Sequence, residues 1–145
     1  MKVAYNNCYG GFGLSPLAET EYSKKKGITL TWYEGIGGYP YKAYRKVTDI
    51  SGLHGHGLRP IALMPSNTDL GDTLTEIPSA NLVYRLWRDD ENRADPDLIE
   101  VIERLGDKAD GCFASLAIKE VPDGSEFEIT EYDGNEDVVP PRMSW

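Results

Sequence analysis

The alternation of apolar and polar side chains along the chain predicts several short strands. Strands are expected over residues 2–7 and 28–34, where apolar residues alternate with other side chains. The same pattern predicts strands over residues 81–88, 113–121 and 125–132. A Pro-Asp-Gly turn sequence separates the last two, so we expect them to pair as an antiparallel hairpin.

Two helices are predicted from their start and stop signals. Ser15 is a suitable N-cap followed by proline, and Gly27 ends the segment after a run of lysines. Asp95 has the same role, also before a proline, and Gly106 or Gly111 ends the second helix. The second helix carries one apolar stripe, made of Leu98, Ile99, Val101, Ile102 and Leu105.

Residues 35–79 show no clear period and are rich in Gly, Pro, Tyr and His, with one brief apolar run at 61–64. Since compact domains seldom contain so long a loop, this segment holds elements that the pattern does not reveal, or it is the functional region. Two helices and five or six strands predict one α+β domain over residues 1–145, with the helices packed on a mainly antiparallel sheet.

Charge divides the chain into two unequal parts. Residues 1–88 hold ten Lys/Arg and seven Asp/Glu, a net charge of +3, whereas residues 89–145 hold five and seventeen, a net charge of −12. Such an acidic block repels phosphate backbones, which disfavours direct nucleic-acid binding. It could instead imitate nucleic acid toward a basic partner, or it could simply keep a small domain soluble.

Composition also predicts where the protein works. No apolar run approaches the roughly 20 residues of a membrane-spanning helix, and the first residues do not resemble a secretion signal. The two cysteines, Cys8 and Cys112, are too few for a disulfide framework. We therefore expect a cytoplasmic protein that does not contact a membrane.

A glycine-rich loop between the first strand and the first helix is a candidate anion site. It contains Gly10, Gly11 and Gly13 and leads to Ser15. Backbone N–H groups at a helix start can bind an anion. The loop is not a GxGxxG motif, because Ser15 occupies the third glycine position, and it lacks the Lys-Ser/Thr of a Walker A loop. The alternative is a tight turn whose glycines serve only backbone geometry.

Arginines and aromatic residues elsewhere could complete a pocket for a small nucleotide-like anion. Guanidinium groups bind phosphate through two hydrogen bonds, and aromatic rings stack on bases. Ordinary decoration of strands by these residue types is the alternative. The residues that we assign to such a site, besides the loop residues above, are Arg45, His54, His56, Arg59, Arg85, Trp87 and Arg88.

Catalytic and metal chemistry have little support in the sequence. Cys8 could be a nucleophile with His54 or His56 as its base, but nothing in the sequence brings them together. The two histidines one residue apart, with no second ligand pair, are a poor zinc signature. We predict neither a metal site nor a cofactor, and we favour a binding protein over an enzyme.

Two stretches carry a family resemblance. One is N-N-C-Y-G-G-F-G-L-S at residues 6–15, and the other runs from A-D-P-D-L-I-E-V at residues 94–101 to E-Y-D-G at residues 131–134. They resemble a family of small proteins encoded by tailed phages and prophages. The resemblance implies an accessory protein of phage origin, and such proteins often act against host defence by sequestering nucleotide signals or by blocking a defence protein.

Three functions follow as hypotheses. The first is a non-catalytic anti-defence protein that binds and sequesters a small anionic nucleotide-type host signal. The second is an acidic inhibitor that binds a host defence or nucleic-acid enzyme, and the third is a small enzyme using Cys8 or His54/His56. Short strands and several aromatic residues further predict a homo-oligomer, because small domains often complete a core at a symmetric interface.

Overall fold

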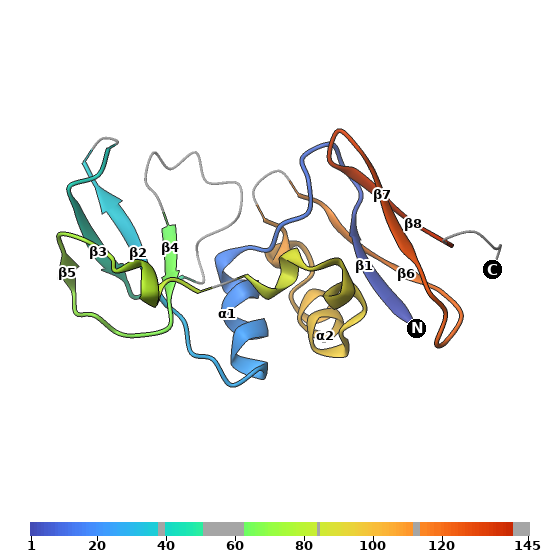
Figure 1. Ribbon diagram of the computed structural model, residues 1–145, viewed down its shortest axis with the longest axis horizontal. Coiled ribbons are helices and arrows are strands. Elements are labelled where there is room, and N and C mark those ends of the chain that lie inside the picture. The colour runs from blue at the N-terminus through green and yellow to red at the C-terminus, as the bar shows by residue number, and fades with distance from the viewer. Residues whose placement is uncertain (38–39, 51–62, 84, 112–113, 141–145) are drawn as a thin grey trace.

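The computed structural model describes residues 1–37, 40–50, 63–83, 85–111 and 114–140. Two helices lie in the middle of the molecule, between a four-stranded sheet on one side and two strand pairs on the other (Figure 1). The described residues form eight strands in three antiparallel sheets. This confirms the predicted α+β class, although we expected five or six strands in one main sheet.

Both predicted helices are present. Helix α1 (Pro16–Lys25) begins at Ser15, whose hydroxyl accepts a hydrogen bond from the Ala18 amide at 3.1 Å. Helix α2 (Pro96–Leu105) begins at Asp95 in the same way. Gly106 ends α2 with a φ of 58°, a left-handed conformation that glycine adopts without steric cost.

The strands of the C-terminal half pair differently from our prediction. Strand β1 (Lys2–Asn6) pairs with β6 (Leu116–Glu120), and β7 (Glu128–Tyr132) pairs with β8 (Asn135–Val139). The predicted hairpin between residues 113–121 and 125–132 is therefore wrong. Strand β7 instead pairs across the tight Asp133-Gly134 turn, where both residues have positive φ as a two-residue hairpin turn requires.

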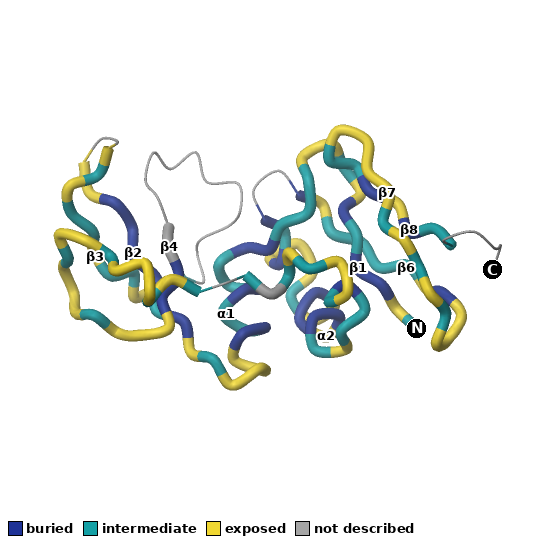
Figure 2. The backbone as a smooth tube through the Cα atoms, viewed as in Figure 1, coloured by how far each residue is buried: buried dark blue, intermediate teal, exposed yellow. Residues whose placement is uncertain are grey.

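The β1–β6 pair lies between the helices and the β7–β8 hairpin. Val3 and Ala4 are both fully buried, so β1 is covered on its two faces (Figure 2). Ala4 packs with the helix residues Tyr22 and Leu98, while Val3 packs with Val138 of β8. Burial on both faces makes β1 the central strand of this half of the molecule.

The remaining strands form a sheet of order β4-β2-β3-β5 beside α1. Their bounds are Thr31–Ile36 for β2, Ala43–Val47 for β3, Leu63–Ser66 for β4 and Thr73–Leu74 for β5. The predicted strand over 28–34 thus starts and ends a few residues later. The segment that showed no period contains three strands, and two of its stretches lie outside the described residues.

The predicted strand over residues 81–88 is wrong. The chain there forms two short 3₁₀ helices, η1 (Ser79–Asn81) and η2 (Leu86–Arg88). Arg85 and Trp87 do alternate, but both bind the Glu19 carboxylate on α1 instead of flanking a neighbouring strand. Tertiary contacts to one helix therefore override the local preference for a strand.

Candidate functional site

The start of α1 is covered by another part of the chain. Ser15 is fully buried, its amide donates to the Ala109 carbonyl at 2.9 Å, and its hydroxyl donates to the Lys108 carbonyl at 2.6 Å. Both carbonyls belong to the 3₁₀ helix η4 (Gly106–Ala109). An anion could reach the N-terminus of α1 only by displacing η4, so Ser15 serves packing and capping here.

Gly10 and Gly11 lie against the β7–β8 turn, whereas Gly13 lies against Gly111. A Cβ atom added to Gly134 would lie 2.4 Å from the Gly11 nitrogen, so the two backbones are in direct contact. The buried Asn6 side chain donates to the carbonyls of Gly134 and Cys8 at 2.7 and 2.8 Å. Gly10 is exposed. This geometry favours the tight-turn alternative for the glycines.

Cys8 contacts Asn6 of the preceding strand β1. It is half-buried, and its thiol donates to the Asn6 side-chain oxygen at 3.3 Å. The two histidines proposed as its bases, His54 and His56, lie outside the described residues, as does Arg59. Among the described residues, no group of three or more His, Cys, Asp or Glu could hold a metal ion.

The described arginines of the predicted site do not form one cluster, because Arg85 and Arg88 both lie near Glu19 whereas Arg45 lies apart from them. Arg45 lies on β3, where its guanidinium pairs with Glu34 on the neighbouring strand β2. Arg88 is exposed and lies over the Trp87 ring at 5.4 Å. Arg45 is on the four-stranded sheet, so the structure separates it from Arg88 and from the glycine loop.

Among the described residues of the predicted site, Trp87 contacts the glycine loop through Phe12. Its ring centroid lies 5.9 Å from that of Phe12, and its indole N–H donates to Glu19 at 2.5 Å. Glu19 is 5% exposed and also forms an ion pair with Arg85, whose Nε lies 3.4 Å from the Glu19 Oε1. Burial raises the pKa of Glu19 above its ordinary value, although Arg85 opposes the shift. One buried carboxylate thus holds residues 85–87 against α1.

We expect Glu19→Gln to change how stability depends on pH. Because the pKa of Glu19 is raised in the folded state, the folded protein binds more protons than the unfolded chain in the window above the ordinary value. Its free energy of unfolding therefore falls as pH rises through this window, and Glu19→Gln should flatten that fall. Urea unfolding between about pH 4 and 7 measures the slope.

The control for the loss of one negative charge is Glu76→Gln, which replaces an exposed carboxylate more than fifty positions from Glu19 in the sequence. If the Glu19→Gln profile had the same slope as that of the unchanged protein, Glu19 would not be the titrating group.

A buried ion pair that the sequence did not indicate joins the two ends of the C-terminal half. Arg93, in the 3₁₀ helix η3 (Asp90–Ala94), contacts both Glu136 oxygens at 2.8 and 3.0 Å. Arg93 is 4% exposed and Glu136 is 9% exposed. Glu136 also accepts from the Asn6 amide, and the Arg93 guanidinium lies 3.6 Å from the centre of the Phe12 ring. No spacing signal connects two residues so far apart in the chain.

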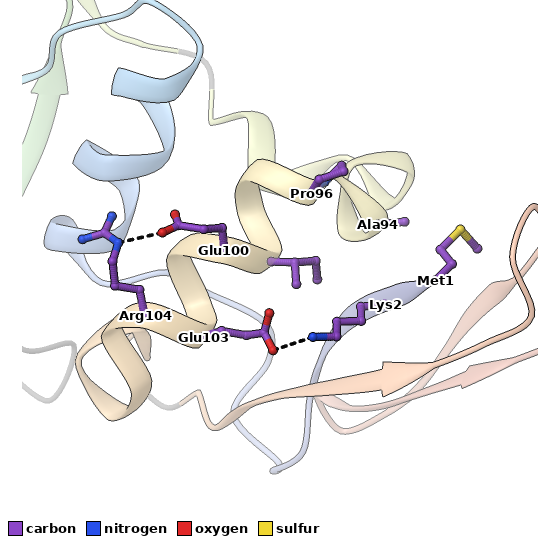
Figure 3. Close-up of a pocket in the computed structure, with 8 residues that line it drawn as sticks. Met1, Lys2, Ala94, Pro96, Glu100, Glu103 and Arg104 are labelled. Carbon is purple, nitrogen blue, oxygen red and sulfur yellow. Dashed lines mark hydrogen bonds and ion pairs between the residues drawn. The ribbon is translucent and has the colours of Figure 1, made fainter.

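A depression lies between α2 and the start of β1 (Figure 3). Its volume is about 680 Å³. Its apolar surface comes from Met1, Ala94, Pro96 and Ile99. The charged groups at its border pair with one another, Lys2 with Glu103 and Arg104 with Glu100, each at 2.9 Å. With its charges paired internally, this depression does not select a ligand of either sign.

A second depression, of about 670 Å³, lies between η3 and the start of β7, and we call it the β7 groove. Phe127 and Ile129, both half-buried, provide its apolar surface. It is lined by four exposed carboxylates, Asp90, Glu91, Glu126 and Glu128.

A third depression, of about 570 Å³, lies beside the other end of the hairpin. Its lining includes the carboxylates of Glu131, Glu136 and Asp137. It also includes Tyr132, whose side chain is 75% exposed. No Lys or Arg is among the described residues that line this depression or the β7 groove. Glu136 is paired with Arg93 and Asp137 with Lys119, so the negative charge of the hairpin surface comes mainly from the exposed carboxylates of the β7 groove and Glu131, beside the exposed Tyr132 ring.

Comparison with protein-family models, with curated proteins and with solved structures gave no match. Within the described ranges, no helix has the length and apolar character needed to cross a membrane. The function is therefore inferred from the charge and shape of the surface.

Proposed function

We propose that this protein is a non-catalytic binding protein whose acidic C-terminal half engages a basic surface on a protein partner. The partner would be a defence or nucleic-acid enzyme of a bacterial host, in line with the resemblance to phage proteins. Complementary potentials accelerate association and exclude partners of the wrong sign.

One observation supports this proposal above the others. Carboxylates from two separate segments, η3 and the start of β7, line the same groove, and they are exposed although η3 also contributes the buried Arg93 and the start of β7 the half-buried Phe127 and Ile129. Asp90 and Glu91 precede Glu126 and Glu128 by more than thirty positions, so the fold itself gathers the charge. A basic surface on a partner would meet several of these carboxylates at once, and such complementary potentials favour association.

The nucleotide-binding hypothesis has less support from this geometry. It depended on outward-facing amides at the start of α1 with arginines nearby. Ser15 is instead buried beneath η4, and Arg45 lies on a separate sheet.

We expect loss of the groove carboxylates to weaken partner capture. The double variant Glu126→Gln/Glu128→Gln removes two charges from the groove, while Asp72→Asn/Glu76→Gln removes two exposed charges from the N-terminal half. The immobilised protein is exposed to bacterial lysate at low salt, retained proteins are identified by mass spectrometry, and the affinity of the purified partner is measured. The groove variant should lose affinity by about tenfold, and the control variant should retain it.

Increasing salt should weaken the complex steeply, because it screens exposed charges. An equal loss in the two variants, or binding that does not respond to salt, would contradict a role for the acidic groove.

A further inference from the structure

Strand β7 has an edge that no described strand covers. Its only strand partner in the described ranges is β8. The Asp133-Gly134 turn makes Tyr132 and Asn135 the pair closest to the turn, and such a pair exchanges backbone hydrogen bonds. Because hydrogen-bonded and non-hydrogen-bonded pairs alternate, the register determines which backbone groups of β7 face away from β8.

Those outward groups belong to Ile129 and Glu131. Both lie in non-hydrogen-bonded pairs, opposite Val138 and Glu136. Their N–H and C=O groups therefore point to the uncovered edge. Ile129 also lines the β7 groove, so backbone donors and acceptors meet the acidic groove at the same place.

The sign of the charge along this edge selects its occupant. Natural proteins protect exposed edges with charged side chains, because an uncovered edge can pair with another strand. The carboxylates of Glu126, Glu128 and Glu131 would repel the same edge of a second copy of this chain. They would attract a segment that carries Lys or Arg.

We propose that the β7 edge binds an extended basic segment of the partner protein, which adds to the β7–β8 hairpin as a third strand. This inference rests on the proposed function and adds how the partner binds. Backbone hydrogen bonds to Ile129 and Glu131 supply affinity that does not depend on sequence, and the groove carboxylates supply the selection for positive charge.

The faces of β7 define the pattern of that segment. Glu128, Thr130 and Tyr132 lie on one face, whereas Ile129 shares the other face with the buried Val138. A bound strand that alternates Lys with Val would place lysines beside Glu128 and the exposed Tyr132 ring, and valines beside Ile129. The five residues of β7 match about 17 Å of such a strand.

The test uses a capped eight-residue peptide of alternating Lys and Val, added to the full-length protein, with amide exchange followed by NMR. The amides of Ile129 and Glu131 should exchange at least about tenfold more slowly when the peptide is bound. The Thr130 amide already bonds to β8 and should not change. A peptide in which Glu replaces Lys should not bind.

A backbone variant provides the second measurement. Ile129→Pro removes the outward N–H without removing a hydrogen bond to β8. It should lower the affinity for the Lys-Val peptide by about tenfold. Ile129→Val keeps the N–H and should bind as the unchanged protein does.

Binding of the peptide without protection of Ile129 and Glu131 would overturn strand addition and leave the charge-based function in place. Absence of any binding would also overturn it, whereas the proposed function is judged separately by partner capture. The exchange measurement uses the unchanged protein, so it decides the question even if Ile129→Pro does not fold.

Discussion

Replacing Arg93 with alanine is expected to lower the free energy of unfolding by about 3–5 kcal/mol, because it leaves the Glu136 carboxylate buried without its partner. Glu136 retains the Asn6 amide as a donor, and one neutral hydrogen bond does not replace a guanidinium that binds both oxygens. Arg93→Ala also uncovers the Phe12 ring, and this lost packing adds to the decrease in the free energy of unfolding.

Urea unfolding of the purified variants measures this effect. Arg104→Ala is the matched control, since it removes an arginine whose ion pairs with Glu100 and Glu21 are more exposed, and only a small loss is expected. The double variant Arg93→Met/Glu136→Leu should recover most of the stability, because it removes both charges and keeps apolar volume. A loss below about 1 kcal/mol in Arg93→Ala would show that the pair does not hold the hairpin in place.

Local signals in the sequence were sufficient for the helices. Ser15 and Asp95 cap α1 and α2 as predicted, and Gly106 ends α2. These signals act within a few residues of the helix end, so they do not depend on how the chain packs. The Asp133-Gly134 turn also has a local sequence signature, because Asp-Gly accommodates the positive φ that both residues adopt.

Strand partners and the course of residues 81–88 could not be obtained in this way. Alternation shows that a segment has two faces, but it does not show which strand lies beside it. Residues 81–88 alternate convincingly, yet Glu19 on α1 binds both Arg85 and Trp87 and draws the segment into a 3₁₀ turn. That contact spans more than sixty residues and has no local signature.

The irregular middle segment conceals strands that depend on close packing. Gly35 on β2 lies under the Tyr41 ring, and a Cβ at this position would meet the ring carbons at 2.4–2.6 Å. In the sequence Gly35 favours a loop, but in the structure its missing side chain leaves room for the Tyr41 ring to cover strand β2. The strands of this sheet are only two to six residues long, which leaves too few positions for a period to show.

The sequence shows the excess of negative charge, but the site residues predicted from it belong to a pocket for an anion, and none of those that the structure describes lines the β7 groove. Counting charges located the acidic half, but the β7 groove exists because η3 and the start of β7 meet in the fold. The glycine loop was predicted to bind an anion from its local sequence alone. Its structural role instead depends on two distant partners, Gly134 and the backbone of η4.

Replacing Gly134 with alanine is expected to lower the free energy of unfolding by about 3–5 kcal/mol, through left-handed strain and a backbone clash together. Gly134 has a φ of 84°, and the added Cβ would lie 2.4 Å from the Gly11 nitrogen and 3.0 Å from the Gly10 carbonyl carbon. Backbone atoms cannot rotate aside as a side chain does, so the hairpin or the glycine loop must move.

Gly124→Ala separates the two causes. Gly124 lies in another turn with a φ of 72°, and a Cβ there would meet no atom within 4 Å. It should lose only the conformational cost, about 1–2 kcal/mol. The difference between the two variants in urea unfolding therefore measures the contact between the β7–β8 turn and the glycine loop. Equal losses in the two variants would mean that the contact between the turn and the loop adds no stability, and that other contacts hold the hairpin, among them the Arg93–Glu136 ion pair and the Val3–Val138 packing.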